Sequence, residues 1–109
     1  MTPALERRLE AISARHDALV AALVADPPPP SAEIARINKE LARAERVVRA
    51  YAAVKERRDE TASLEQVIAE STGVDAEMAQ MAEDELATLE ETTPALEETL
   101  AHLLLPADE

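Results

Sequence analysis

Hydrophobic positions recur at alternating steps of three and four residues in three stretches of the chain, the spacing that places side chains on one face of an α-helix. The first stripe consists of Leu5, Leu9, Ile12, His16, Leu19 and Leu23. The second stripe consists of Ile34, Ile37, Leu41, Ala44, Val48 and Tyr51, and it returns later as Leu64, Val67 and Ile68. The third consists of Ala79, Ala82, Leu86, Leu89, Thr93, Leu96, Leu100 and Leu103. The pattern predicts three helices that pack against one another through these stripes.

The first two predicted helices have clear start and stop signals. Thr2 is an acceptable N-cap, and Pro3 occupies the first helical position, where the missing N–H of proline has no cost. The run Pro27–Pro30 should end the first helix, because a residue that precedes proline is driven out of the α region. The run is predicted to act as an extended link rather than as a ligand for a proline-binding module. Ser31 is predicted to be the N-cap of the second helix.

The third helix is bounded in the same way. Gly73, the only glycine, is predicted to supply a left-handed turn after the second helix, and Asp75 to cap the third. Pro94 lies inside the third helix, where it removes a backbone hydrogen bond, so we expect a bend there with Thr93 facing inward. The predicted helices cover residues 3–25, 32–70 and 76–105.

The predicted fold is all-α: a single helical domain over residues 1–109, built as an elongated antiparallel three-helix bundle with a long central helix. That helix would be about 60 Å long, at about 1.5 Å per residue, and a bend near residues 57–61 is left open. Because the outer helices are shorter, the hairpin around residues 70–75 is expected to project as a two-helix arm.

Charge is distributed unevenly along the chain. All 11 Lys and Arg residues lie at or before Arg58, whereas residues 59–109 contain 15 acidic residues and no basic one. An acidic helix that lies along a more basic one explains this asymmetry, and a docking surface for a basic protein is the alternative. Direct binding of nucleic acid by the acidic half is not expected, because phosphates would be repelled.

The residues give no pattern typical of a catalytic, cofactor or metal site. The acidic residues that could form paired carboxylates are Glu83, Asp84, Glu85, Glu90, Glu91, Glu97 and Glu98. Metal centres in helical bundles use a histidine three residues after a glutamate on each of two helices, whereas Glu98 and His102 are four apart and have no matching pair. His16 lies on the first stripe and is expected to be a packed or partly exposed histidine rather than a ligand. We therefore predict no cofactor, no metal and no enzymatic activity.

Other functional classes are also disfavoured. Cysteine is absent, and a single glycine leaves no phosphate-binding loop. Tyr51 alone cannot form a base-stacking platform. The longest apolar run, from Ala18 to Ala25, is much shorter than the roughly 20 residues of a membrane span, and a cytoplasmic protein is expected.

Four strings carry a resemblance to a known family. They are LERRLEAISARH at 5–16, MAEDEL at 81–86, ALEETL at 95–100 and HLLLPADE at 102–109. Together they resemble the N-terminal helical domain of bacterial peptide chain release factor 1. The Arg15–His16 pair matches the opening helix of that family, and the closing Leu-Leu-Leu-Pro-x-Asp motif is matched by Leu103, Leu104, Leu105, Pro106 and Asp108. This closing string favours factor 1 over factor 2.

The resemblance implies a role in translation termination at UAA and UAG codons, exercised by the full-length factor. It implies contact with the ribosome near the stalk base and with the GTP-hydrolysing class II release factor. The Gly-Gly-Gln and Pro-x-Thr tripeptides of the family are missing from these 109 residues. We therefore expect an excised or truncated domain, carry over no functional residue, and expect no hydrolase activity from it.

A second hypothesis is a free-standing helical adaptor that associates with itself through uncovered stripes and has no role in translation. The coding sequence after Glu109 would distinguish the two hypotheses. Apolar surface near residues 100–105 would also permit a homodimer of the isolated chain.

Overall fold

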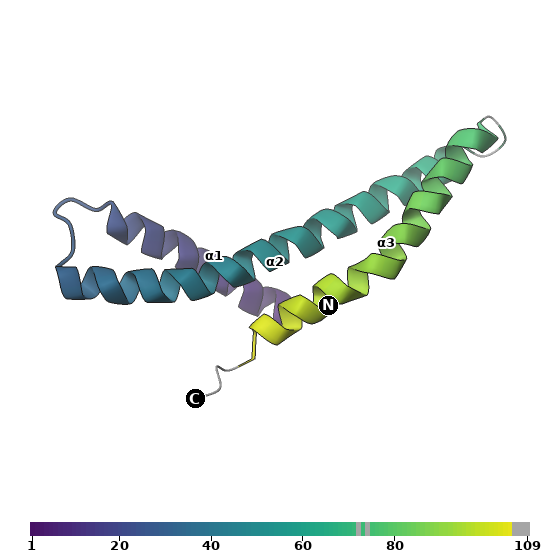
Figure 1. The fold of residues 1–109 in the computed structure, drawn as a ribbon. Coiled ribbons are helices and arrows are strands. Elements are labelled where there is room, and N and C mark those ends of the chain that lie inside the picture. Colours follow the sequence, from purple (N-terminus) through teal and green to yellow (C-terminus); the bar gives the residue numbers. More distant parts are fainter. Residues whose placement is uncertain (72, 74, 106–109) are drawn as a thin grey trace. The chain divides into compact units, whose positions relative to one another are not determined.

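The computed structural model describes residues 1–71, 73 and 75–105. It contains three α-helices: α1 (Pro3–Leu23), α2 (Ser31–Glu70) and α3 (Ala76–Leu103) (Figure 1). The described residues include no β-strand. The predicted all-α fold with three helices is therefore confirmed.

Two of the predicted helix caps are present. The Thr2 hydroxyl accepts a hydrogen bond from the Leu5 N–H at 3.1 Å, and Pro3 follows it as the first helical residue. At the start of α3, an Asp75 carboxylate oxygen accepts from the Met78 N–H, also at 3.1 Å. Each cap satisfies one of the backbone donors that the first turn of a helix leaves unpaired.

The predicted cap of α2 was wrong. Pro30 has the capping position, because its carbonyl accepts the first helical hydrogen bond from the Ile34 N–H at 3.0 Å, and Ser31 is already inside the helix. The restriction that a proline imposes applies to the residue before it. Ser31 follows the last proline of the run and can therefore adopt the helical conformation.

The outer helices end two residues earlier than predicted, at Leu23 and at Leu103. After α1, the Val24 N–H bonds to the Ala21 carbonyl at 3.3 Å, which closes the last turn more tightly than an α-helical turn. Asp26 precedes Pro27 and cannot continue the helix. Leu105 precedes Pro106 in the sequence, so it is driven out of the helical conformation for the same reason. Pro106 and Asp108, which belong to the closing string, lie outside the described residues.

The chain divides into two compact units, residues 1–51 and 52–109. In the first unit, α1 runs antiparallel to the first part of α2. Glu10 of α1 contacts Tyr51, whereas Arg15, further along α1, contacts the earlier Glu40. The buried core of this unit consists of Leu9, Leu19, Ile37, Ala44, Val47 and Tyr51. All of these except Val47 belong to the stripes that the sequence predicted.

In the second unit, the remainder of α2 forms an antiparallel hairpin with α3. The Arg57 guanidinium donates to the Thr92 hydroxyl at 3.0 Å, well before the turn that joins the helices. The buried residues are Val54, Ala82, Leu89, Leu100 and Leu104. Gly73 lies in the turn with the predicted positive φ, 84°.

The helix α2 is continuous through residues 57–61, and α3 is continuous through Pro94. A single domain over residues 1–109 and a bend at Pro94 stay predictions. Within the described ranges, no helical segment combines the length and the apolarity needed to cross a bilayer.

Candidate functional site

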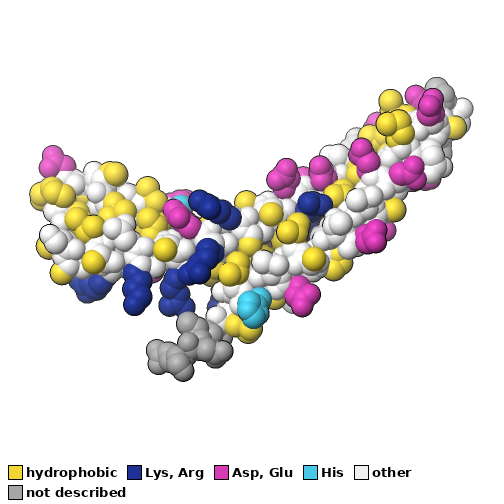
Figure 2. Space-filling view, viewed as in Figure 1, with side chains coloured by type: hydrophobic (Ala, Val, Ile, Leu, Met, Phe, Trp, Pro, Cys, Tyr) yellow, Lys and Arg dark blue, Asp and Glu magenta, His cyan; other side chains and the backbone are white. Residues whose placement is uncertain are grey.

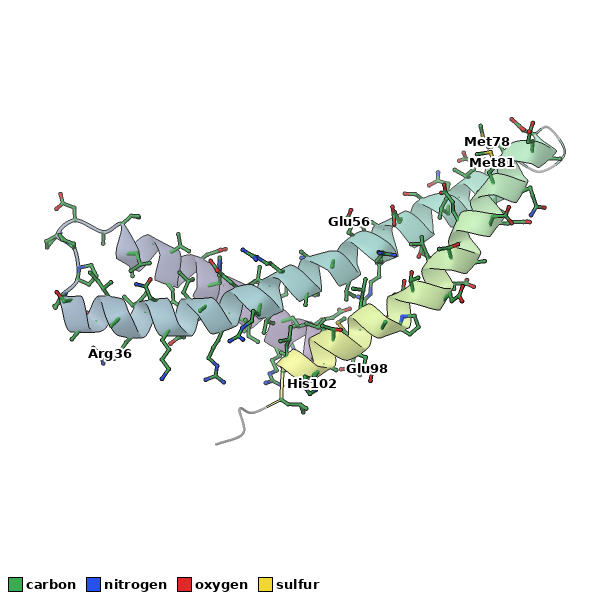
Figure 3. All side chains as sticks on the ribbon, viewed as in Figure 1. Arg36, Glu56, Met78, Met81, Glu98 and His102 are labelled. Carbon is green, nitrogen blue, oxygen red and sulfur yellow. The ribbon has the colours of Figure 1, made fainter. Side chains whose placement is uncertain are left out.

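Glu98 and His102, the pair compared with the metal motif of helical bundles, lie near the end of α3. Figure 3 shows Glu98 and His102 on the last turns of this helix, and both are exposed. Among the described residues, no three Asp, Glu, His or Cys side chains come together in a way that could hold a metal ion.

His16 lies in the first unit with its side chain largely buried, 19% exposed. Its Nδ1 is 3.2 Å from an Asp17 carboxylate oxygen, and its Nε2 is 3.8 Å from a Glu45 carboxylate oxygen. The ring fills a position on the hydrophobic stripe and keeps both nitrogens near acidic groups. This is the environment of a packed histidine in a helix pair.

The neighbouring residue, Arg15, forms an ion pair that joins α1 to α2. Its Nε lies 2.6 Å from Glu40 Oε2, and its Nη2 lies 3.3 Å from Glu40 Oε1, so two donors meet the carboxylate. This hydrogen bonding lowers the pKa of Glu40 and raises the pKa of Arg15. Both side chains are about half exposed or more, so the pair contributes little to stability.

Tyr51, the only aromatic residue, is buried at the end of the first unit. Its hydroxyl donates to Glu10 Oε1 at 2.9 Å. A buried phenol needs such a partner, since an unpaired polar group inside a protein is costly. Tyr51 is thus a structural residue.

Hollows lie on the surface of the second unit, and one of them is beside Pro94. It has a volume of about 350 Å³ and is lined by Arg58, Thr61, Glu90, Thr93, Pro94 and Glu97. The Thr93 hydroxyl is buried and has no hydrogen-bond partner, in keeping with the prediction that Thr93 faces inward.

Another hollow, here called the methionine groove, lies between α2 and the first turns of α3. It has a volume of about 410 Å³ and is lined by Leu64, Val67, Asp75, Glu77, Met78, Met81, Ala82 and Glu85. Figure 3 shows Met78 and Met81 on the first turns of α3, near the end of the hairpin. These two residues are 53% and 63% exposed, so the apolar wall of the groove is accessible to a partner.

The methionine groove continues along the hairpin. An adjoining hollow of about 340 Å³ shares Leu64 and Glu85 with it and extends to Glu60, Ser63, Thr88 and Leu89. An apolar floor with polar edges therefore follows the seam between the two helices. This is the shape that an amphipathic helix or an extended apolar segment fits.

The surface around this seam is acidic. Figure 2 shows acidic side chains spread over the visible face of the hairpin. No Lys or Arg follows Arg58 in the sequence, so the part of α3 that lines the groove carries acidic groups and no Lys or Arg. The field at the groove favours a positively charged partner.

Met78 and Met81 belong to none of the hydrophobic stripes predicted from the sequence. A signal was present, because the two residues are three apart and flank the stripe residues Ala79 and Ala82. An apolar pair beside a stripe already filled by small residues widens the apolar face beyond what one neighbouring helix covers.

The family model described as PCRF domain matches residues 12–109 of the chain. The match includes all of α2 and α3 and most of α1. No curated protein matches the chain, and no solved structure matches it.

Proposed function

This chain belongs to the PCRF domain family, the N-terminal helical domain of class I release factors, and from that premise we propose that it serves in translation termination at UAA and UAG codons. The family places the chain in translation termination, which is part of protein biosynthesis on the ribosome. The match over residues 12–109 is the observation that carries the proposal. The finer codon assignment is supported by the closing string, from Leu103 to Asp108, which resembles that of factor 1.

The domain itself acts through contacts and not through chemistry. PCRF domains are non-catalytic helical domains, and we extend this to the present chain: its role is to bind, and it releases no peptide by itself. We propose that its partners are the stalk-base region of the ribosome and the class II release factor GTPase, and that it works in the cytoplasm. An accessible apolar groove with an acidic rim supports a contact role.

The codon assignment is tested with a full-length factor that carries this domain. Ribosomes programmed with UAA, UAG or UGA and loaded with a labelled peptidyl-tRNA are mixed with the factor, and peptide release is timed. We expect release at UAA and UAG and background rates at UGA. The isolated chain should release nothing at any codon. Release at UGA equal to that at UAG would refute the assignment.

The contact role is tested by deletion. The full-length factor and a version without residues 12–109 are compared for their affinity for ribosomes and for the rate at which the class II GTPase recycles them. We expect the deleted version to keep release at saturating concentration but to bind more weakly and to recycle more slowly. An unchanged affinity together with an unchanged recycling rate would refute the role.

A further inference from the structure

We propose that the methionine groove is the docking site for a basic amphipathic segment of a protein partner, which inserts apolar side chains between α2 and α3. The inference rests on the proposed function, because it gives the surface and the partner chemistry for the same contact role. Three features of the second unit carry it: accessible apolar side chains, a groove that follows the helix seam, and an acidic rim.

The apolar anchor points come first. Met78 and Met81 are 53% and 63% exposed, although they flank the stripe residues Ala79 and Ala82, which are half-buried and buried. Exposed apolar side chains that line a hollow mark interaction surfaces more often than scattered ones do. Methionine suits this use, since its flexible thioether adapts to different partner shapes.

The size of the groove favours a peptide segment. Its volume of about 410 Å³ falls in the usual range of binding pockets, roughly 300–1,000 Å³. The adjoining hollow extends it along the seam toward Leu89. A helix that presents side chains three and four residues apart would place successive anchors along such a floor.

The rim selects the charge of the partner. Asp75, Glu77 and Glu85 line the groove, and Glu60 continues the acidic edge. No Lys or Arg lies in the chain after Arg58 to neutralise these groups. Lys and Arg residues that flank the apolar anchors of a partner would therefore meet complementary charge, which speeds encounter and excludes acidic competitors.

The same charges argue against other occupants. Nucleic acid and anionic lipid surfaces would bring phosphates against the acidic rim. A second copy of the chain would offer either its own acidic second unit or a first unit that is nearly neutral, with eight Lys and Arg against seven Asp and Glu in residues 1–51. A basic protein segment is the occupant that satisfies both the floor and the rim.

The methionines allow a direct test in the intact chain. The protein has three of them, and Met1 lies outside the groove, so selective labelling of the methyl carbons with ¹³C gives two reporters and one internal reference. The probe is a synthetic amphipathic helical peptide of Leu and Lys, compared with a matched peptide of Leu and Glu. We expect the Leu–Lys peptide to shift the Met78 and Met81 signals in a saturable way and to leave Met1 unchanged. The Leu–Glu peptide should have no effect.

Variants distinguish the contribution of the apolar floor to binding from that of the acidic rim. Met81→Lys should weaken binding of the Leu–Lys peptide about tenfold, because it removes an apolar anchor and adds a like charge. Glu77→Gln with Glu85→Gln should weaken it several-fold, with less effect at high salt. Glu91→Gln with Glu98→Gln is the matched control: it removes the same charge elsewhere on α3 and should leave the affinity near that of the wild type. Circular dichroism confirms that each variant is folded.

Four results would overturn the proposal. Three of them are equal shifts at Met1 and in the groove, equal binding of the acidic peptide, and equal weakening by the control and rim variants. Shifts of Met78 and Met81 that depend on protein concentration without peptide would also overturn it, since they would identify a second copy as the occupant.

Sedimentation with ribosomes separates this inference from the proposed function. If the wild-type chain pellets with ribosomes but no peptide enters the groove, the groove proposal fails and the contact role stands. If the peptide binds but the chain does not pellet with ribosomes, the groove stands and the contact role of the isolated domain fails. Should both hold, Met81→Lys is expected to reduce the pelleted fraction relative to the Glu91→Gln and Glu98→Gln control.

Discussion

Threonine hydroxyls on α3 differ in how they are satisfied. Those of Thr88, Thr92 and Thr99 each donate to the carbonyl four residues earlier, at 3.2, 3.0 and 3.0 Å. The Thr93 hydroxyl is buried without any partner, and Pro94 follows it immediately. A buried polar atom that makes no hydrogen bond contributes only the cost of its desolvation.

Replacing Thr93 with valine should therefore stabilise the protein. Thr93→Val keeps the branched shape but removes the unpaired hydroxyl, and we expect the free energy of unfolding to rise by roughly 1 kcal/mol. Urea denaturation monitored by circular dichroism measures the change. Thr99→Val is the control, because its exposed hydroxyl already has a partner. A loss of stability in Thr93→Val would mean that the hydroxyl contributes an interaction that this structure does not contain.

The Arg15–Glu40 pair predicts a specific pH dependence. The hydrogen bond from Arg15 lowers the pKa of Glu40 in the folded state, so the pair stabilises the fold above the unfolded glutamate pKa, about 4.3. That contribution is lost as the pH falls through the lowered folded pKa. A double-mutant cycle of Arg15→Ala and Glu40→Gln should show a small favourable coupling in melting temperature at pH 7 and none at pH 2.5. Equal coupling at both values would contradict the assignment.

At the scale of the helices, the sequence predicted the roles of those residues that interact with near neighbours in the chain. Thr2 and Asp75 cap their own first turns, and Gly73 adopts its positive φ where the chain leaves α2. Ser31 was misassigned because Pro30 can also occupy the capping position. The general preference for serine at that position does not exclude a proline. Local patterns fix a helix start only to within one or two residues.

The burial of the stripes was also predictable from local spacing, whereas the methionine groove was not. Each stripe residue on α3 is buried or half-buried, because the three-and-four spacing already defines which face can pack. Met78 and Met81 lie beside that face, and their exposure depends on how much of α3 is covered by the packed part of α2. Such coverage is a tertiary property, so the spacing alone does not reveal it.

The turn between α2 and α3 allows a test of backbone strain without side-chain crowding. Gly73 has φ of 84°, and a Cβ built there meets no atom within 4 Å. Gly73→Ala should therefore destabilise the hairpin by about 1 kcal/mol through the left-handed conformation alone. Gly73→Asn should cost less, since asparagine tolerates this region better. Equal stability of all three proteins in thermal melts would show that the turn changes its conformation when substituted.

At the scale of the whole molecule, charge is the dominant feature. The net charge is −12, and residues 59–109 carry 15 acidic groups without a basic one. Among the described residues of α3, these groups lie mainly at exposed positions, where they repel one another through solvent. The same charges that select a basic partner at the methionine groove therefore oppose folding of the hairpin when no partner is bound.

This repulsion predicts that salt stabilises the free protein. Between about 0.01 M and about 1 M sodium chloride, the screening length falls from roughly 30 Å to roughly 3 Å, so the melting temperature should rise. Glu91→Lys with Glu98→Lys should raise the melting temperature at low salt and shrink the salt response, because it reduces the negative charge of α3. Arg36→Gln is a suitable control on the exposed surface of the first unit, and it should leave the salt response unchanged or increase it slightly. A melting temperature that falls with salt would show that attraction between opposite charges, and not repulsion among the acidic residues, determines the electrostatic balance of this protein.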